Sequence, residues 1–222
     1  MFRFSIRELF SHKIRFLLTT FSVLVGVSFV VGSFVLTASV RAQFDNLFTE
    51  INSGIDLTVR AEQKLESGPF GATPSPVPES LAEEIRALDG VERAEGTLQF
   101  FPALPIQDDG DPLASMGGPP LGINWVDAPG VSALEVVEGT APGADGEIAL
   151  DIDAADRGGF AVGDTIAVQT PVGAADYELV GTFRFGESNA LSGATLMAFT
   201  TAEAQRLASI PDAFQTIDIA VA

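Results

Sequence analysis

The feature that most constrains this chain is an uncharged run near its start, from Phe16 to Val40. As a helix with a rise of about 1.5 Å per residue, it would be about 37 Å long, enough to cross a hydrocarbon core of about 30 Å. Val40, Arg41 and Ala42 resemble a weak signal-peptide cleavage site, so a cleaved leader is the main alternative. The apolar region of a signal peptide usually has only about 7–15 residues, however. The run therefore predicts a transmembrane helix over residues 16–40.

Basic residues stand on one side of this predicted span. Arg3, Arg7, Lys13 and Arg15 precede it, and only Glu8 opposes them. Because the basic flank of a membrane helix stays in the cytoplasm, the N-terminus is expected there. Residues 41–222 are then extracytoplasmic, and the chain is expected in the inner membrane of a bacterial cell.

The first fifteen residues have an apolar face of their own. At about 100° per residue, these apolar side chains fall within an arc of roughly 140°. They are Phe2, Ile6, Leu9, Phe10 and Ile14. This pattern predicts an amphipathic basic helix over residues 1–15 on the cytoplasmic leaflet of the bilayer. A disordered basic tail is the alternative.

The predicted span also has a face of small residues. Members of the main face lie within roughly 60° of one another on a helical wheel; they are Thr19, Ser22, Gly26, Ser33 and Thr37. Small residues allow helix backbones to approach closely in lipid, although Gly and Ser are common in membrane helices generally. This face predicts helix partners, supplied by a second copy of the chain, another subunit or a C-terminal transmembrane half of the same protein.

The remainder of the chain is acidic. After residue 40, 8 basic residues stand against 29 acidic ones. Nucleic acid is therefore excluded as a partner, because phosphates need a basic surface. The chain has no cysteine, so the exported domain has no disulfide and depends on its hydrophobic core.

Local patterns predict a mixed α+β domain after a helical stalk at 41–54. A capping box at Ser80–Glu83 predicts a helix to Leu88, and a second at Thr200–Glu203 predicts a helix to Ala208. Loops rich in Gly, Pro and Asp are expected at 67–78 and 107–122. Alternation and turn residues predict strands at 55–60, 97–101, 123–126, 147–151, 165–169, 177–185, 195–199 and 217–221. Each capped helix precedes a strand, which hints at a weak internal repeat.

The order of several turn motifs resembles that of FtsX/MacB-type ABC transporter permeases. The resemblance begins with the basic N-terminus, the early span and SGIDLTVRA, and includes YELVG and the closing TIDIAVA. Within Glu138–Val168 it has Gly139 with Pro142, Gly146 with Glu147, Ala154 with Ala155, and Gly163 with Asp164. Thr140 departs from the pattern, since many members have arginine there. These motifs are structural turns and strands, so their specificity lies in their order.

The resemblance implies an α+β extracytoplasmic domain on one N-terminal transmembrane helix. Porter-like β-α-β lobes would occupy residues 55–105 and 195–222, with an inserted β-rich lobe at 106–194. It also implies an ATP-binding ABC subunit as partner, and further spans beyond this portion. Roles in such families include lipoprotein release, efflux of peptides or antibiotics, and control of cell-wall hydrolases, so an exported lipid, lipoprotein or peptide is the expected client.

The chain itself lacks recognisable catalytic chemistry. No Gly-Lys pair exists to form a phosphate loop, His12 is the only histidine, and no cysteine is available as a nucleophile. Asp151, Asp153 and Asp156 could bind calcium, but Asp151 or Asp153 as the cap of a short helix is the favoured interpretation. We therefore expect no cofactor, no metal and no enzyme activity.

Two functions remain open from the sequence. The favoured one is the N-terminal part of a permease subunit, whose outer domain transmits motion driven by a separate ATPase. The alternative is a stand-alone membrane-anchored binding or sensor domain, and an anchored exported enzyme ranks third. Phe70, Phe100, Phe101 and Trp125 could line a client groove, although aromatic residues near strands are more often core.

Overall fold

The protein is described here from a computed structural model, which describes residues 13–51, 55–62, 75–114, 118–128, 131–186 and 194–221. The chain divides into two compact units, Met1–Phe48 and Thr49–Ala222. Each unit is described by itself. The strands and the shorter helices all belong to the second unit, which we call the domain.

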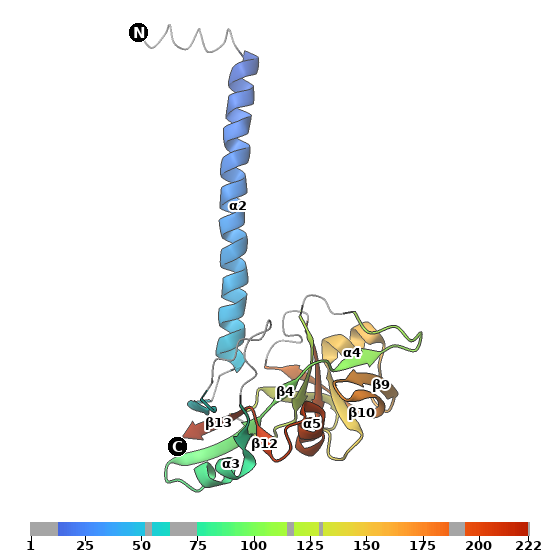
Figure 1. Cartoon of the computed structure of the whole chain (residues 1–222). Coiled ribbons are helices and arrows are strands. Elements are labelled where there is room, and N and C mark those ends of the chain that lie inside the picture. Colours follow the sequence, from blue (N-terminus) through green and yellow to red (C-terminus); the bar gives the residue numbers. More distant parts are fainter. Residues whose placement is uncertain are drawn as a thin grey trace. The chain divides into compact units, whose positions relative to one another are not determined.

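A single long helix, α2 (Lys13–Ile51), dominates the first unit (Figure 1). Its segment Leu17–Val35 has a mean hydropathy of 2.0, and none of its residues is buried. By length and composition it is the one helix in the described ranges that could cross a membrane. The core helix of a soluble protein would instead bury its apolar face. The helix continues without a break beyond the apolar segment into the range predicted as a stalk, and residues 52–54 lie outside the described part.

A small antiparallel sheet forms one side of the domain. Its strands, in spatial order, are β1 (Leu57–Val59), β13 (Thr216–Val221) and β3 (Val91–Thr97). Helix α3 (Glu79–Arg86) packs on β3 (Figure 1). A two-stranded ladder lies nearby, made of β2 (Val77–Pro78) and β12 (Ala213–Phe214).

Alternation along the strands explains the core under α3. Ile217 and Ile219 on β13 pack with Ala94 of β3 and with Ala82 of α3. Because side chains alternate between the two faces of a strand, the residues between them point to the opposite face. The small sheet therefore has one apolar face, which is covered by α3, and one polar face.

The first and last described strands of the domain lie side by side. Leu57 pairs with Ile219, and Val59 pairs with Ile217. The Asp56 backbone N–H donates to the Ile219 carbonyl at 2.9 Å, and the Val221 N–H donates to Asp56 Oδ2 at 2.8 Å. The backbone therefore enters and leaves the small sheet at the same end.

An eight-stranded mixed sheet forms the rest of the domain. Its continuous path is β4-β6-β11-β8-β10-β9-β5, and β7 also pairs with β10. The strands are β4 (Gln99–Phe100), β5 (Leu104–Ile106), β6 (Pro120–Asn124), β7 (Leu134–Gly139), β8 (Glu147–Asp151), β9 (Thr165–Thr170), β10 (Gly173–Phe185) and β11 (Thr195–Phe199). On one side, β10 pairs first with β9 and then with β7; on its other side it pairs with β8 in parallel.

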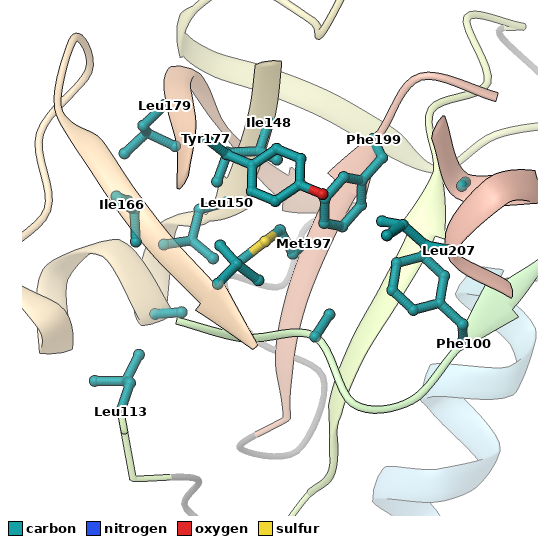
Figure 2. Close-up of a cluster of buried hydrophobic side chains, with 14 of the residues drawn as sticks. Phe100, Leu113, Ile148, Leu150, Ile166, Tyr177, Leu179, Met197, Phe199 and Leu207 are labelled. Carbon is teal, nitrogen blue, oxygen red and sulfur yellow. The ribbon is translucent and has the colours of Figure 1, made fainter. Parts of the chain in front are cut away.

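Both faces of the central strands of this sheet are buried. Ile148, Leu150 and Phe199 join the main core, to which α4 (Ile152–Gly158) and α5 (Thr201–Ala208) contribute (Figure 2). Ala149 and Ala198 point to the opposite face, where they pack with Phe183. This two-sided burial explains why the inner residues of β8 (Ile148–Leu150) and of β11 (Leu196–Phe199) are apolar without alternation.

Several predicted elements match the structure and others do not. The predicted bounds of the strands at 147–151 and 195–199 are those of β8 and β11, and Thr200 caps α5 by accepting from the Glu203 N–H at 3.2 Å. The capping box at Ser80 is wrong, because α3 begins at Glu79 after Pro78 and has no side-chain cap. The predictions also missed β3 as far as Gly96 and all of β7, and the loop predicted to Gly122 includes the start of β6.

The pairing of the large sheet crosses the boundaries predicted for the inserted lobe. Strand β4 precedes residue 106 and β11 follows residue 194, yet both pair within this sheet. The two predicted capped helices also pack on different sheets, with α3 against β3 and α5 against β4 and β6. Hydrogen bonding therefore joins the predicted β-rich insertion to parts of the predicted porter-like lobe.

Candidate functional site

A pocket of about 380 Å³ is lined by residues of both sheets. Its volume falls within the range of about 300–1,000 Å³ that is typical of small-molecule sites. The small sheet contributes its polar face, and the large sheet contributes the ends of β6, β7 and β10. We call this space the inter-sheet pocket. Its lining residues include Ile55, Thr97, Ile123, Asn124, Val126, Val131, Leu134, Phe185, Gln215, Thr216 and Asp218.

The polar wall of the pocket follows from the alternation of β13. Ile217 and Ile219 are buried toward α3, so Thr216 and Asp218 must lie on the other face of the strand. Thr97 of β3 lies directly opposite Thr216 in the ladder. The three side chains therefore form a polar surface along one side of the pocket.

Among the described residues that line the inter-sheet pocket, Asp218 is the one that carries a charge. Its Oδ1 accepts from the Thr58 hydroxyl at 2.8 Å, and its Oδ2 accepts from the Thr97 hydroxyl at 3.0 Å. The hydroxyls of Thr97 and Thr216 are 2.6 Å apart. Among the described residues, no Lys or Arg forms an ion pair with Asp218.

Two amides fix the backbone where the chain passes from the small sheet to the large one. Asn124 accepts from the Leu98 N–H through Oδ1 and donates to the Gly96 carbonyl through Nδ2, both at 2.9 Å. Gln215 accepts from the Gln99 N–H at 3.1 Å and donates to the Gln99 carbonyl at 2.7 Å. These bonds hold the polar rim of the pocket in place.

The apolar wall adjoins the single tryptophan of the chain. Trp125 stands between the lining residues Asn124 and Val126. Its ring meets Phe183 edge-on, with ring centroids 5.9 Å apart, and it packs in one cluster with the pocket residues Ile123, Leu134 and Phe185. Its Nε1 is buried and has no hydrogen-bond partner among the described residues. The tryptophan therefore lies behind the apolar wall rather than in the pocket.

A second hollow, of about 680 Å³, is lined by acidic residues. Four carboxylates belong to it: Asp108, Asp109, Asp164 and Asp176. Within the described residues, no group of three or more His, Cys, Asp or Glu side chains is arranged to hold a metal ion. Asp164 instead accepts from the Ala161 N–H at 2.8 Å and stabilises a turn.

Asp151 serves as a helix cap, as the favoured interpretation predicted. It accepts from the Ala154 N–H at 2.9 Å and from the Leu196 N–H at 2.7 Å. Burial raises the pKa of Asp151 to about 6, against the opposing effects of these two hydrogen bonds and of the Arg157 charge. The carboxylate therefore ties the start of α4 to the start of β11.

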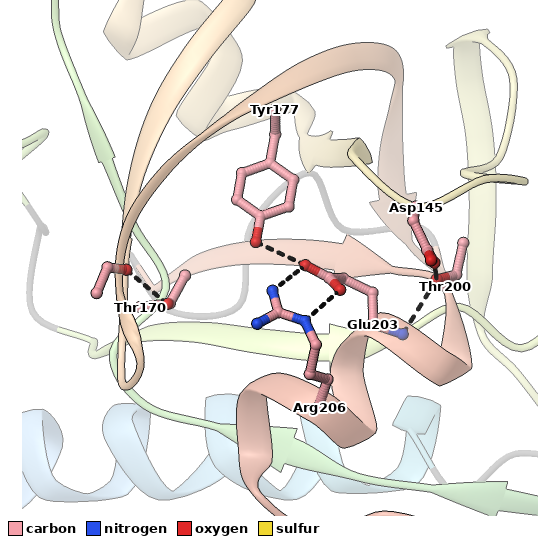
Figure 3. Close-up of polar contacts among 7 residues, drawn as sticks. Asp145, Thr170, Tyr177, Thr200, Glu203 and Arg206 are labelled. Atoms are coloured by element: carbon pink, nitrogen blue, oxygen red, sulfur yellow. Dashed lines mark hydrogen bonds and ion pairs between the residues drawn. The ribbon is translucent and has the colours of Figure 1, made fainter.

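Figure 3 shows a second polar cluster, between β10 and α5, in which Tyr177 and Glu203 are buried and Arg206 is exposed. The Tyr177 hydroxyl donates to Glu203 Oε1 at 2.8 Å, and Arg206 donates to both oxygens of Glu203, at 2.6 and 2.8 Å. Burial, and then Glu203, raises the pKa of Tyr177, whereas the Arg206 hydrogen bonds lower the pKa of Glu203. Tyr177 is thereby kept neutral, Glu203 negatively charged and Arg206 positively charged, so the cluster holds β10 and α5 together through stable hydrogen bonds.

The residues predicted for the membrane surface and for topology lie mostly outside the described part of the chain. These include Phe2, Arg3, Ile6, Arg7, Leu9 and Phe10. Ile14 is exposed on α2, while Lys13 and Arg15 lie on α2 with side chains outside the description. Their membrane roles stay predictions.

The predicted helix-packing face lies on α2. Thr19, Ser22, Gly26 and Ser33 are exposed there, and the Thr37 side chain lies outside the description. A Cβ added at Gly26 would meet nothing within 4 Å. Packing of this face against another helix stays a prediction.

The structure supports the core alternative for two of the four aromatic residues that could line a client groove, Phe100 and Trp125. Phe100 is buried in the main core, Phe101 is exposed, and Trp125 lies behind the pocket wall; Phe70 lies outside the described ranges. The sequence analysis instead missed Thr97, Thr216 and Asp218. The alternation of TIDIAV contained the signal, because it separates Thr216 and Asp218 from the apolar face.

Comparison with known proteins identifies the class of this protein. The chain combines an α+β domain with one apolar helix that is long enough to cross a membrane. The family model described as "MacB-like periplasmic core domain" matches residues 16–222. The chain therefore belongs to the MacB-like periplasmic core domain family.

One solved structure agrees with this assignment at the level of the fold. The periplasmic region of MacB from Actinobacillus actinomycetemcomitans matches with a TM-score of 0.53 at 10% identity, covering 77% of this chain and 78% of that one. The extracellular domain of the noncanonic ABC-type transporter YknZ from Gram-positive bacteria matches with a TM-score of 0.48 at 10% identity, covering 74% and 83%. No curated protein sequence matches this chain.

Proposed function

We propose that this chain is part of a permease subunit in which ATP hydrolysis by a separate ABC subunit moves the extracytoplasmic domain. The observation that carries the proposal is the family match over residues 16–222, which includes both the apolar helix and the domain. A match limited to the domain would have supported an exported module equally well.

The helix supports transmission of motion. Helix α2 runs unbroken for 39 residues, whereas its strongly apolar segment Leu17–Val35 has only 19. At about 1.5 Å per residue, the remaining turns extend the helix well beyond a bilayer core. A tilt or rotation of the span would therefore be carried along one continuous helix as far as Ile51.

The composition of the site supports a binding or mechanical role rather than catalysis. The described lining of the inter-sheet pocket has one carboxylate, together with hydroxyls, amides and apolar groups, and contains no His, Cys, Lys or Arg. We propose that the chain is not an enzyme and uses no cofactor of its own. The proposed location is the bacterial inner membrane, with the domain on its outer side and an exported lipid, lipoprotein or peptide as client.

The second candidate is a stand-alone anchored binding or sensor domain. The inter-sheet pocket favours it, because a preformed cavity with one charged group is the ordinary build of a small-molecule site. It differs from the first candidate in needing no ATPase.

Co-purification separates the two candidates. The full-length protein is purified from its own cells in mild detergent, and associated ATPase activity is measured with and without residues 55–222. The permease proposal expects a stoichiometric ABC ATPase whose turnover changes when the domain is removed. A full-length protein that purifies without any ATPase would overturn the proposal and favour the anchored domain.

A further inference from the structure

We propose that the inter-sheet pocket binds a small organic cation, a primary ammonium on an apolar body, with the ammonium at Asp218 and the apolar part against Ile123, Val131 and Leu134. This inference does not depend on the proposed coupling to an ATPase. Three features of the described residues carry it: the direction of the hydroxyl protons, the unpaired charge, and the opposed walls.

The hydroxyl protons of the polar wall are directed toward Asp218, either directly or through the Thr97 hydroxyl. Thr97 donates its only hydroxyl proton to Asp218 Oδ2. The short contact between the hydroxyls of Thr97 and Thr216 must then be donated by Thr216, because a hydroxyl has one proton to give. Thr58 donates to the other carboxylate oxygen. The polar wall therefore offers a ligand only acceptor lone pairs at these side chains, so the ligand must bring the donor.

The charge of this wall selects a cationic donor over a neutral one. Asp218 lies directly opposite Glu95 in the β13 and β3 ladder, and like charges in directly opposed positions are destabilising. Arg86 reaches Glu95 only at 3.5 Å, and no cation pairs with Asp218 in the described part. Arg93, the cation two residues from Glu95 on β3, forms no ion pair there either. An ammonium, with three donors and a positive charge, matches both requirements.

The opposite wall requires an apolar body on the same ligand. Ile55, Val126 and Val131 pack around Ala128 and Ala220 on one side, and Leu134 and Phe185 close the other. A fully polar cation would leave the apolar wall hydrated. A fully apolar molecule would desolvate Asp218 without replacing its hydrogen bonds to water. An amphipathic cation satisfies both walls at once.

The position of Trp125 makes the binding measurable without a label. It is the only tryptophan of the chain, and it packs with Leu134 and Phe185, which line the pocket. The full-length chain in neutral maltoside micelles is titrated with n-hexylammonium while Trp125 emission is recorded. The matched probes are n-hexanol, which has the same chain without charge, and hexanoate, which has the opposite charge.

The expected result is a saturable change in Trp125 emission with n-hexylammonium. We expect n-hexanol and hexanoate to bind at least about tenfold more weakly. Asp218→Asn should weaken n-hexylammonium binding at least about tenfold while leaving hexanol binding unchanged. The matched control is Asp176→Asn, which removes a carboxylate from the acidic hollow and should leave binding as in the wild type.

A second variant keeps the test decisive if Asp218→Asn fails to fold. Thr216→Val preserves shape and removes the acceptor next to Asp218, so it should weaken n-hexylammonium binding severalfold without changing the emission of the free protein. Equal affinities for hexanol and n-hexylammonium would overturn the proposal. So would unchanged n-hexylammonium binding in both folded variants, or the absence of any saturable change, checked by saturation-transfer NMR.

Discussion

Asp151 shows how a single buried carboxylate couples stability to pH. Its ordinary pKa of 3.8 is raised by burial to about 6 in the folded protein. Between these two pH values the folded state holds a proton that the unfolded state has lost, so the free energy of unfolding falls as pH rises. This difference in pKa between the unfolded and folded states corresponds to about 3 kcal/mol of stability, which is present at low pH and fully lost above about pH 6.

We therefore expect Asp151→Asn to flatten the pH dependence of stability between pH 4 and pH 6. Asparagine does not titrate, so the fall in unfolding free energy over this window should be smaller than in the wild type by about 3 kcal/mol. Urea unfolding of the full chain in micelles at several pH values measures this directly. The control is Asp108→Asn, an exposed loop carboxylate; equal slopes in the wild type and Asp151→Asn would refute the expectation.

Gly181 allows β10 to approach the turn after β7. It pairs with Gly139, and a Cβ at this position would collide with the Thr140 carbonyl oxygen and lie 2.9 Å from the Glu138 carbonyl oxygen. Gly181→Ala should destabilise the domain by about 1–3 kcal/mol through overpacking. Thermal unfolding checks this against Gly143→Ala, whose Cβ would lie 3.8 Å from Glu147 Oε2 and which should be neutral. Similar melting temperatures for the two variants would show that the close approach is relaxed in solution.

At the scale of elements, two similar sequence motifs give different helix starts. Thr200 accepts from the Glu203 N–H, whereas α3 has no side-chain cap. Thr200→Ala should therefore cost about 1 kcal/mol of stability, and Ser80→Ala should cost less than about 0.5 kcal/mol. Chemical unfolding of both variants measures the difference. A cost for Ser80→Ala as large as that for Thr200→Ala would mean that Ser80 caps α3 in solution.

The same pair of helices shows what sequence patterns could and could not predict. The Ser80 motif has the residues of a capping box, but α3 begins at Glu79 after Pro78, two residues before the start that a Ser80 cap would give. Strands β8 and β11 were predictable to the residue, because short apolar runs bounded by turns are typical of buried strands. Strand β7 was missed because almost all of it is exposed, so no alternation marks it.

The candidate site was less predictable than the fold. Thr216 and Asp218 lie on a predicted strand, but the partner that completes the polar wall, Thr97, lies 119 residues from Thr216 in sequence. Only the register of β13 against β3 brings these residues together. Long-range register is set by the packing of whole elements, and local propensity does not contain it.

At the scale of the whole molecule, the predicted orientation in the membrane can be tested with cysteines. The chain has none of its own, so single-cysteine variants report one position each. In cells whose outer membrane is permeabilised and whose inner membrane is intact, a membrane-impermeant maleimide should label Asp108→Cys, which lies in an exposed loop. Ser11→Cys should be labelled only after the inner membrane is opened. The reverse labelling pattern would show that the basic flank does not set the orientation.

The neighbouring positions of β1 and β13 have a mechanical consequence. Pulling Ile55 and Val221 away from each other would apply force at one end of the ladder between β1 and β13. The hydrogen bonds of Asp56 to Ile219 and Val221 lie at that end, so they would break first and the remaining bonds would follow in sequence. Moving both residues in the same direction would leave that ladder unloaded and carry the domain as a rigid body. The domain would therefore move as one body when Ile55 and Val221 move together, and would open at its three-stranded sheet when they separate.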